Sequence, residues 1–468
     1  MNSDRAGKLN TNSNDILICI LISLSFLWTG CGYLSWFYHL AEFYGASKVD
    51  MLTEVIGYLF QAAGLIVFAL YRKRYAGQYR SVYSYTLISA SGLVLNLLAV
   101  LSPSAPVSLI FGYGMNIVFG MIAGSYLTIL AGHASASAYG IIFGAGYGIG
   151  SILSYFISLI GSGSFLEDPR AFFIYTAVYA LTIPVSVKII RQNIRDAASE
   201  ARSTISTASL DRRFYYLWLP GITILLLSCV KSGGFYFNAA DLGDHNVSLE
   251  LSRSFYAAGL IAAGLINDRK RSAGAVLCIA ALVFPFFSIA GSHTDINYLM
   301  WVLGYIFFGF YSVYRVLLFV DISKGKDLSH LACIGLMWGR LGDAAGAASG
   351  IMLSSRPMVL ITVMALLFVI CIFLFFHLYH TMYMHPVSPE VDYIQAFAAR
   401  YDLSQREADI FRMVIGGCTN KEIAERLYIS ENTVKFHMRN LLRKTDCSKR
   451  KELLALYDDS SRSPERSH

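Results

Sequence analysis

Charged residues are scarce in this chain of 468 residues, because Lys, Arg, Asp and Glu make up only 15% of it. Soluble domains are about 25% charged, so an ordinary cytosolic protein is not expected. The deficit is confined to one part of the chain. Only 42 of the first 386 residues are charged, against 27 of the 82 residues from position 387 onward. The composition therefore predicts a membrane-embedded body followed by a small soluble tail.

Motifs for catalysis and for metal binding are also missing. The eight cysteines include no C-x-x-C pair, and the ten histidines are scattered along the chain. His377 and His380 form an i, i+3 pair that we interpret as interfacial rather than metal-binding. There is no nucleotide-binding loop, catalytic triad or nucleophile elbow. We expect no catalytic residues, no metal, no cofactor and no enzymatic activity. The net charge of +7 is too small for general affinity for nucleic acids, so only its local placement matters.

Apolar stretches of about 20 residues recur along the body, and each is long enough to cross about 30 Å of hydrocarbon. We expect twelve spans, at residues 15–39, 52–71, 82–101, 107–131, 137–160, 171–190, 214–236, 250–267, 273–291, 297–320, 330–353 and 357–380. Basic residues gather in the loops after spans two, six, eight and ten, and acidic residues dominate the opposite loops. The positive-inside rule then places both termini, including segment 1–14, on the cytoplasmic side of a bacterial inner membrane. The first span is interpreted as a retained helix rather than a signal peptide.

An internal repeat divides the body into halves at about 15–190 and 214–380, joined by a basic cytoplasmic loop at 191–213. The sequence A-A-G-L-I at 62–66 recurs at 257–261, an offset of 195 residues. The R-K-R that follows at 72–74 recurs at 269–271, an offset of 197 residues. Spans five and eleven both carry small residues every four positions, a pattern that lets helix backbones approach closely in lipid. Two parallel six-helix halves are therefore expected.

This all-α organisation of residues 15–380 resembles the major facilitator superfamily. The loop Gly264-Leu265-Ile266-Asn267-Asp268-Arg269-Lys270-Arg271 is similar to the signature G-x-x-x-D-R-x-x-R/K of that family, with the last base one position early. The corresponding loop of the first half, Ala69 to Arg74, keeps the bases and lacks the acid. In transporters of this family the loop stabilises one access state through a charge relay. The resemblance implies the fold, and the altered first-half loop argues against efficient transport.

Ionisable residues also lie within the predicted spans of the second half: Lys231, Arg253, Arg315, Arg340 and Asp343. Each costs at least about 2.5–3.5 kcal/mol in a bilayer, so such residues often mark a functional site. Arg340 and Asp343 are three residues apart and are expected to neutralise each other, which leaves three cations without an obvious partner. Two interpretations stay open: a cavity for an anionic or aromatic ligand, with Arg315 as its best candidate, or snorkelling of Lys231 and Arg253 to the outer headgroups. Glu54 is expected at the interface. The candidate aromatic walls of the cavity are Trp28, Trp36, Tyr236 and Tyr311.

Helix-capping patterns follow one another closely in the tail. The sequences S-Q-R-E at 404–407 and T-N-K-E at 419–422 are capping boxes, with a hydroxyl at the N-cap and Glu at position N3. Ser430 and Ser448 are expected to cap two further helices, and Gly416-Gly417 to end the first. Apolar residues recur at helical spacing between these signals. The tail is therefore predicted to hold four short helices with a helix-turn-helix at 400–460, between a linker at 381–399 and a polar end at 461–468.

Four spaced motifs in this tail resemble the LuxR-type DNA-binding domain. They are L-S-Q-R-E at 403–407, G-G-C-T-N-K-E-I-A at 416–424, S-E-N-T-V-K-F-H at 430–437, and Lys444 with Arg450. Thr445 and Lys449 depart from the Leu and Ser that are common in that family. Helix 431–444 is expected to enter the major groove of double-stranded promoter DNA. The residues expected to read bases are Lys435, Phe436 and Arg439. The residues expected on phosphates are Lys421, Thr433, Arg443 and Lys444.

Together these features predict a membrane-integral, one-component transcription regulator in the lipid bilayer. The body senses an unknown small ligand, and the tail binds promoter DNA, as a homodimer and with RNA polymerase as a partner if the protein is an activator. The alternative is an active small-molecule transporter with a regulatory DNA-binding tail. Uptake of the ligand by vesicles that contain the protein separates the two hypotheses.

Overall fold

The structure is a computed structural model that describes residues 13–74, 78–160, 210–239, 249–290, 297–323, 329–380 and 397–462. Within these ranges positions 399, 416, 417 and 428 are excepted, and a few positions between 174 and 188 are described in addition. The described residues include no β-strand. The chain divides into two compact units, Met1–Tyr379 and His380–His468, and each is described by itself.

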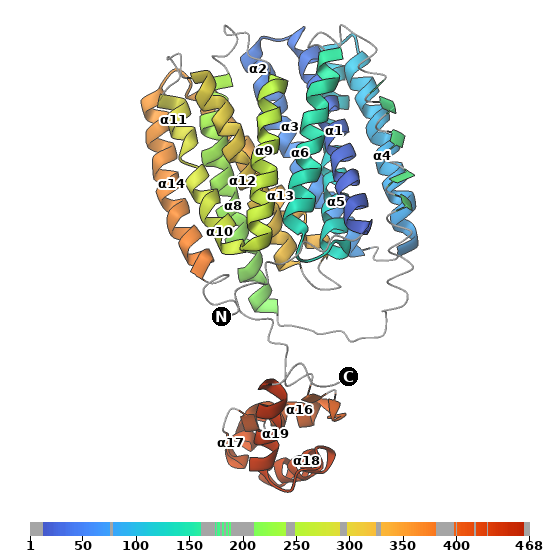
Figure 1. Cartoon of the computed structure of the whole chain (residues 1–468), viewed down its shortest axis with the longest axis vertical. Coiled ribbons are helices and arrows are strands. Elements are labelled where there is room, and N and C mark those ends of the chain that lie inside the picture. The colour runs from blue at the N-terminus through green and yellow to red at the C-terminus, as the bar shows by residue number, and fades with distance from the viewer. Residues whose placement is uncertain are drawn as a thin grey trace, which may run out of the picture. The chain divides into compact units, whose positions relative to one another are not determined.

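The first half of the membrane unit is built from long apolar helices (Figure 1). They are α1 (Ser13–Ala41), α2 (Ala46–Asp50), the π-helix η1 (Met51–Ile56), α3 (Gly57–Arg74), α4 (Gln78–Leu101), α5 (Ala105–His133) and α6 (Tyr139–Ile160). The predicted spans one to five are therefore found as helices, and the second begins as the π-helix η1. The sixth predicted span, 171–190, lies largely outside the described residues.

The second half contains α8 (Leu210–Ala239), α9 (Leu249–Arg269), α10 (Arg271–Ala281), α11 (Phe284–Ala290), α12 (Asn297–Ile322), the 3-10 helix η3 (Ser329–Leu331), α13 (Ile334–Met352) and α14 (Pro357–Tyr379). The ninth predicted span is two helices, because the chain turns between α10 and α11. Pro285 lies at the second position of α11, where its missing N–H is tolerated, whereas it would break a continuous helix.

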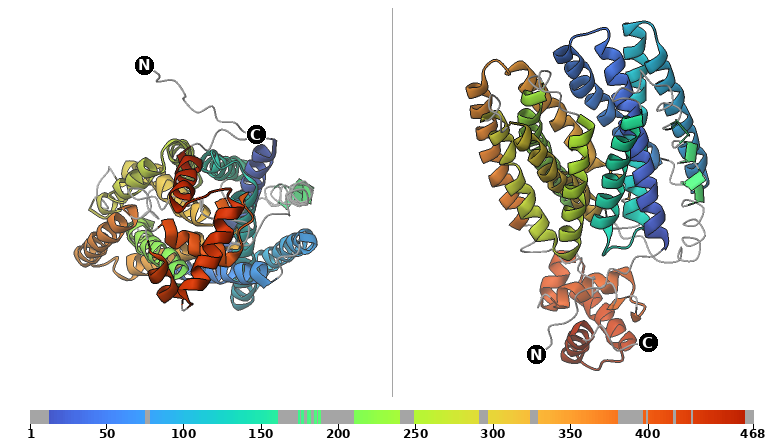
Figure 2. Two further views of the ribbon diagram at one scale, coloured as in Figure 1. Left: turned by 90° about the horizontal axis from the view of Figure 1, so that it is seen from below. Right: turned by 45° about the horizontal axis from the view of Figure 1, so that its top comes forward.

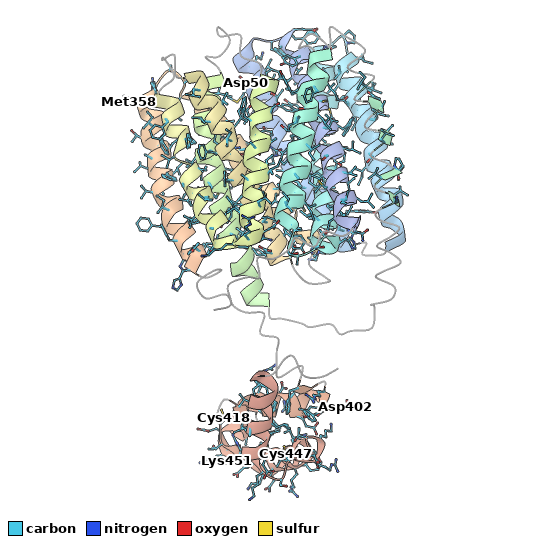
Figure 3. All side chains as sticks on the ribbon, viewed as in Figure 1. Asp50, Met358, Asp402, Cys418, Cys447 and Lys451 are labelled. Carbon is cyan, nitrogen blue, oxygen red and sulfur yellow. The ribbon has the colours of Figure 1, made fainter. Side chains whose placement is uncertain are left out.

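Seven of the described helices are long and apolar enough to cross a membrane. α13 is not among them, because Arg340 and Asp343 lower its hydropathy. The outer surface fits a lipid environment, since α14 exposes Met358, Leu366 and Phe373 by 77%, 63% and 73%. Figure 3 shows Met358 at the outer edge of the helix bundle. Exposed apolar side chains in such numbers identify a membrane protein.

Two glycines at the same place in the repeat confirm that the halves share one packing. A Cβ atom on Gly64 of α3 would lie 1.9 Å from the carbonyl oxygen of Ile117 in α5. A Cβ on Gly259 of α9 would lie 1.8 Å from the carbonyl oxygen of Ile306 in α12. Both positions therefore require glycine, and each brings the second helix of its half against the fourth.

The halves lie side by side, as Figure 2 shows from two directions, with first-half helices in blue to teal and second-half helices in green to orange. α6 meets α9 through small residues on both helices. Cβ atoms on Gly140 and Gly144 would lie 2.5 Å and 2.3 Å from the carbonyl oxygens of Gly264 and Leu260. The glycine pattern of span five thus brings the two halves together.

The tail unit is a separate bundle of short helices, α16 (Gln405–Ile415), α17 (Asn420–Leu427), α18 (Glu431–Lys444) and α19 (Arg450–Arg462). Its own hydrophobic core includes Phe411, Val434, Leu441 and Leu453. Phe397, which our prediction placed in the linker, also belongs to this core and stacks on Phe411 at 4.7 Å. The unit therefore has the internal packing of an independent domain.

The predicted caps at Ser404, Thr419 and Ser430 are confirmed. The backbone N–H of Ser404 donates to Glu407 at 2.8 Å, and that of Thr419 donates to Glu422 at 2.7 Å. The hydroxyl of Ser430 accepts from the backbone N–H of Thr433 at 3.1 Å. α16 ends at Ile415, directly before the predicted stop, although Gly416-Gly417 lie outside the described residues.

Candidate ligand cavity and DNA-binding helix

A buried carboxylate organises the charged residues of the second half. Asp343 of α13 has no exposed surface, and Lys231 of α8 lies 2.7 Å from it. Arg315 of α12 approaches it at 3.1 Å and Arg340 at 3.5 Å. The predicted pairing of Arg340 with Asp343 is confirmed. The prediction that Lys231 and Arg315 have no obvious local partner was wrong, because three helices bring all three cations to one acid.

Hydroxyl groups complete the environment of this carboxylate. Ser228 and Ser232 of α8 each donate to Asp343 at 3.0 Å, and Tyr311 is hydrogen-bonded to Ser228. A buried charge is tolerated only when paired and hydrogen-bonded, and Asp343 satisfies both conditions. The residue is thus a fixed counter-ion behind the cations.

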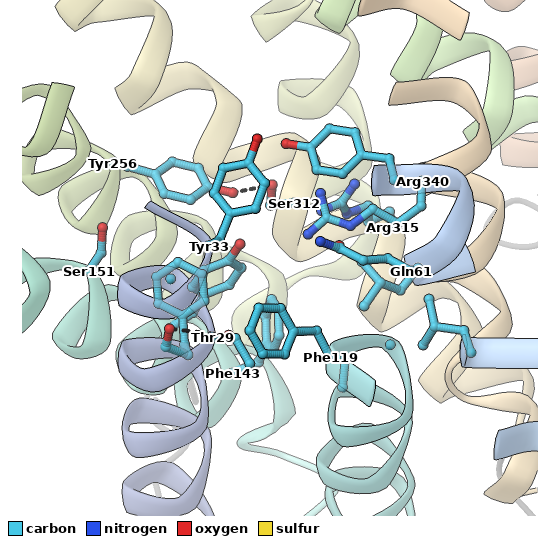
Figure 4. A pocket seen from close by; sticks show the side chains of 18 of the residues that line it. Thr29, Tyr33, Gln61, Phe119, Phe143, Ser151, Tyr256, Ser312, Arg315 and Arg340 are labelled. Carbon is cyan, nitrogen blue, oxygen red and sulfur yellow. Dashed lines mark hydrogen bonds between the residues drawn. The ribbon is translucent and has the colours of Figure 1, made fainter. Parts of the chain in front are cut away.

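The cations border a cavity of about 180 Å³ that both halves line (Figure 4). Lys231, Arg315 and Arg340 line it, whereas Asp343 does not. Figure 4 shows Arg315 and Arg340 together beside Gln61 of α3, away from Ser151. Phe26, Phe119, Phe143, Tyr147 and Tyr256 form much of the remaining wall. The structure therefore brings together four of the five predicted residues, with Arg253 the exception, since its side chain lies outside the described residues.

The aromatic walls differ from those predicted. Trp28 and Trp36 are fully buried and do not line the cavity, and the same holds for Tyr311. The side chain of Tyr236 lies outside the described residues. Trp28 instead packs edge-on against Phe119, at 5.0 Å between ring centroids, and so supports the wall from behind.

Two cavity-lining tyrosines of the first half, Tyr33 and Tyr58, were not singled out by the sequence. Glu54 in η1 was expected at the interface, but it is only 7% exposed and accepts a hydrogen bond from Tyr33. Tyr58 packs under the guanidinium of Arg340 at 4.5 Å, a cation–π contact between the halves. The sequence analysis did not predict the π-helix, because hydropathy does not reveal such segments. They are frequent at functional sites.

A second polar contact joins the halves at the ends of α6 and α9. Asp268, in the family-like loop signature, accepts the backbone N–H groups of Gly140 and Ile141 at 2.7 Å each. Arg271 donates to Asp268 at 3.0 Å and to Asp321 at 2.9 Å. The second-half loop therefore contacts the other half through Asp268. The first-half loop has no acid at the corresponding position.

The predicted base-reading residues share the outer side of α18. Lys435, Phe436 and Arg439 are exposed, Phe436 by 57%, whereas Val434 and Met438 are buried. Lys435 pairs with Glu431 at 3.0 Å, and both side chains are about half exposed, so this pair is weak. The geometry leaves the three side chains accessible to a groove.

The predicted phosphate contacts have different surroundings. Lys421 and Arg443 are exposed, and Thr433 is hydrogen-bonded to Ser430 at the start of α18. The ammonium of Lys444 instead donates to Glu407 at 2.8 Å and to the carbonyl oxygen of Asp402 at 2.7 Å. Its role on phosphate stays a prediction, while its contacts tie α18 to α16.

Arg450 has a structural role that the sequence did not reveal. It donates to the carbonyl oxygens of Val414 and Cys418, at 3.2 Å and 2.7 Å, and thereby joins α19 to the end of α16. Figure 3 marks Asp402, Cys418 and Cys447 in this unit.

Residues 402–457 match the family of bacterial regulatory proteins, luxR family. The tail is a LuxR-type helix-turn-helix domain. A nitrate/nitrite response regulator protein homolog of Haemophilus influenzae is 43% identical over 60 residues, which are 13% of this chain and 29% of that protein. The nitrate/nitrite response regulator protein NarP of Escherichia coli is 50% identical over 48 residues, which are 10% of this chain and 22% of that protein. The spore germination protein GerE of Bacillus subtilis is 40% identical over 48 residues, 10% of this chain and 65% of that protein. The chain thus spans less than two thirds of the length of each relative, and the likeness is to the DNA-binding domain.

The membrane unit has the major facilitator fold. The crystal structure of the human organic anion transporter MFSD10 superposes with a TM-score of 0.57 at 15% identity, over 77% of this chain and 99% of that chain. At this identity the likeness concerns the fold. The predicted fold class, a polytopic all-α membrane body followed by a LuxR-type domain, is thereby confirmed.

Proposed function

We propose that this protein is a membrane-integral, one-component transcription regulator. The membrane unit senses a small ligand in its central cavity, and the LuxR-type domain binds promoter DNA. The observation that supports this most is that one chain contains both a DNA-binding domain and a major facilitator fold. The cavity of that fold is lined by three basic side chains. The proposal includes no enzymatic activity.

The proposed topology follows from charge. The bases in the loops after spans two, six, eight and ten support a topology with these loops, and both termini, on the cytoplasmic side of the inner membrane. The LuxR-type domain then has access to DNA. LuxR-type domains bind paired half-sites, so a homodimer is the proposed active form, with RNA polymerase as a partner if the protein activates transcription.

The proposed ligand site comprises Lys231, Arg315, Arg340 and Asp343, with Arg253 as a further candidate. Arg315 is the central residue because it is 3% exposed, lines the cavity and pairs with Asp343. Ligand binding there would change the state of the membrane unit, and the domain would report that change at the promoter.

The test uses a promoter reporter in cells that carry the wild type or Arg315→Ala, at equal levels of inserted protein. Transcript profiling of a deletion strain first supplies the promoter and points to the ligand. We expect Arg315→Ala to abolish the ligand response while the full-length variant still binds operator DNA as the wild type does. A full ligand response in the variant would remove Arg315 from the sensing role.

A working transporter with a regulatory tail is the second candidate. The Asp268 contact between the halves supports it, because major facilitator transporters use this loop to stabilise one access state. The corresponding first-half loop has bases at 72–74 but no acid, and this difference favours the sensor. Accumulation of ligand above equilibrium in vesicles containing the protein would establish transport, and a transcriptional response without accumulation would establish a sensor.

A further inference from the structure

In the charged cluster near the cavity, the basic side chains line the cavity and the acidic side chains do not. Side chains of Lys231 and Arg340 keep 16% and 19% of their surface accessible, whereas Asp343 keeps none. Among the described residues, no Asp or Glu lines the cavity. Lys231, Arg315 and Arg340 share the single carboxylate of Asp343, so this cluster keeps an excess of positive charge, which suits an anion.

Arg315 has a donor that the protein does not use. It is 3% exposed, and its Nε has no hydrogen-bond partner among the described residues. A buried donor without a partner costs about 1–3 kcal/mol, and an acceptor in the cavity would remove that cost. The three cations already hold the carboxylate of Asp343, and guanidinium groups present a planar fork that matches carboxylates. A second carboxylate is therefore the anion that the site fits best.

The remainder of the wall and the volume restrict the rest of the ligand. Phe26, Phe119, Phe143 and Tyr147 present rings to the cavity, and rings prefer offset or edge-to-face contact with another ring. A dry cavity of about 150 Å³ accommodates benzene. The present cavity, about 180 Å³, thus has room for one ring with a short acidic group.

We infer that the ligand of this cavity is a single-ring aromatic monocarboxylate. Its carboxylate lies between Arg315 and Arg340, and its ring lies against the aromatic wall of the first half. The ligand then bridges the halves, because α12 and α13 supply the arginines while α1, α5 and α6 supply the rings. This inference rests on the proposed function in that it concerns the same cavity.

The experiment measures binding to the purified full-length protein in lipid nanodiscs, by tryptophan fluorescence and by the shift in Tm. Trp28 lies behind Phe119 and reports on the cavity. The probes are benzoate, phenylacetate and hydroxyphenylacetate. Phenylacetamide lacks the charge, acetate lacks the ring, and cyclohexylacetate lacks aromaticity. We expect phenylacetate to bind at least about tenfold more tightly than each of these three, because each lost feature removes an interaction that the cavity offers.

Two variants, each with a matched control, locate the binding. Arg315→Gln should weaken phenylacetate binding by about 10- to 100-fold, which corresponds to a charge-assisted hydrogen bond, whereas exposed Arg356→Gln should not. Gly30→Val fills the cavity without a clash, because a Cβ there has nothing within 4 Å, and it should abolish binding with all charges intact. Gly132→Val, equally free of contacts, should bind as the wild type does.

Equal binding of phenylacetamide, acetate or cyclohexylacetate would overturn the inference, and so would the absence of binding by all three single-ring carboxylates. Binding that survives Gly30→Val would place the ligand elsewhere and would also overturn it. A different result would contradict the proposed function alone: phenylacetate would bind as inferred, but no promoter would respond to it. A promoter response to a ligand of another class would leave the proposed function standing and remove this inference.

Discussion

Asp268 of the second half accepts a hydrogen bond from the backbone N–H of Gly140 in the first half, at 2.7 Å. The next N–H, of Ile141, donates to the other oxygen of the same carboxylate, also at 2.7 Å. These are N–H groups of the first turn of α6, which have no partner within the helix. The carboxylate also lies at the positive end of the helix dipole. Asp268 therefore caps a helix of the opposite half, and any separation of α6 from α9 breaks both bonds.

Asp268→Asn should weaken this contact, because an amide has one acceptor oxygen and no charge. We expect faster hydrogen exchange of the Gly140 and Ile141 amides, by about tenfold or more for a loss of about 1.5–3 kcal/mol. Mass spectrometry of the full-length protein in nanodiscs measures it. Asp15→Asn is the matched control, since Asp15 accepts from Ser135 within the first half, at 2.9 Å and 2.7 Å. Unchanged exchange at residues 140–141 in Asp268→Asn would show that packing alone holds the halves.

Gly64→Ala and Gly259→Ala should each destabilise the membrane unit. The added methyl would lie within 2 Å of a carbonyl oxygen of the neighbouring helix, so the helices must move apart. Overpacking of this kind costs about 1–3 kcal/mol. Thermal unfolding in detergent measures the effect, with Gly132→Ala as a control that has open space around the new methyl. Because the two sites are equivalent in the repeat, similar losses in Tm are expected, and an unaffected Gly259→Ala would contradict the shared packing.

Local features of the fold could be predicted from the sequence. The capping boxes at Ser404 and Thr419, and the repeat that includes Gly64 and Gly259, are short patterns whose physics operates within one or two turns. Apolar length likewise predicted most spans. The break between α10 and α11 was missed, because Pro285 lies in a stretch whose hydropathy stays high on both sides.

The environment of Asp343 could not be predicted in the same way. Sequence spacing reveals a partner three residues away, and it therefore indicated Arg340. Lys231 and Arg315 come from other helices, and only tertiary packing places them against the acid. Lys444 was similarly assigned to DNA by its place in the motif, although the fold gives its ammonium two partners inside the domain. When charged residues are far apart in sequence, no local pattern indicates which of them form ion pairs.

The contact between Lys444 and Glu407 should make the stability of the LuxR-type domain depend on pH. Burial alone would raise the pKa of Glu407, but hydrogen bonds from Lys444 and Ser404 outweigh it and hold that pKa below its ordinary value of 4.5. The stabilisation is therefore present above about pH 4.5 and is lost as the pH falls through the lowered pKa. Glu407→Gln should lower the Tm of the 387–468 fragment at pH 7, and the difference from wild type should vanish in acid. Glu422→Gln, in the exposed second capping box, should have a smaller effect. A difference between wild type and Glu407→Gln that is constant with pH would contradict this account.

Lys435→Ala and Arg439→Ala should remove the sequence preference of the LuxR-type domain without unfolding it. Both side chains are exposed on α18, opposite the buried Val434 and Met438, so the core does not depend on them. Each lost bidentate base contact should cost about 1–3 kcal/mol of discrimination. The measurement compares binding of the 387–468 fragment to its operator and to random DNA at several salt concentrations. Arg412→Ala is the matched control, because Arg412 is exposed on α16 and pairs with Asp409.

A substitution at a proposed phosphate contact should affect DNA binding differently from a substitution at a proposed base contact, and the two are therefore compared. Arg443→Ala should weaken binding to operator and random DNA alike and should lower the salt slope by about one. Lys435→Ala and Arg439→Ala should instead lower the ratio of operator to random affinity by about 5- to 150-fold, as expected for 1–3 kcal/mol. If Lys435 contacts DNA as proposed, it must first leave its weak pair with Glu431, so Glu431→Gln should raise the affinity for both DNAs. If the two base-reading variants keep the wild-type ratio, α18 does not read sequence through this side, and the assignment of these residues fails.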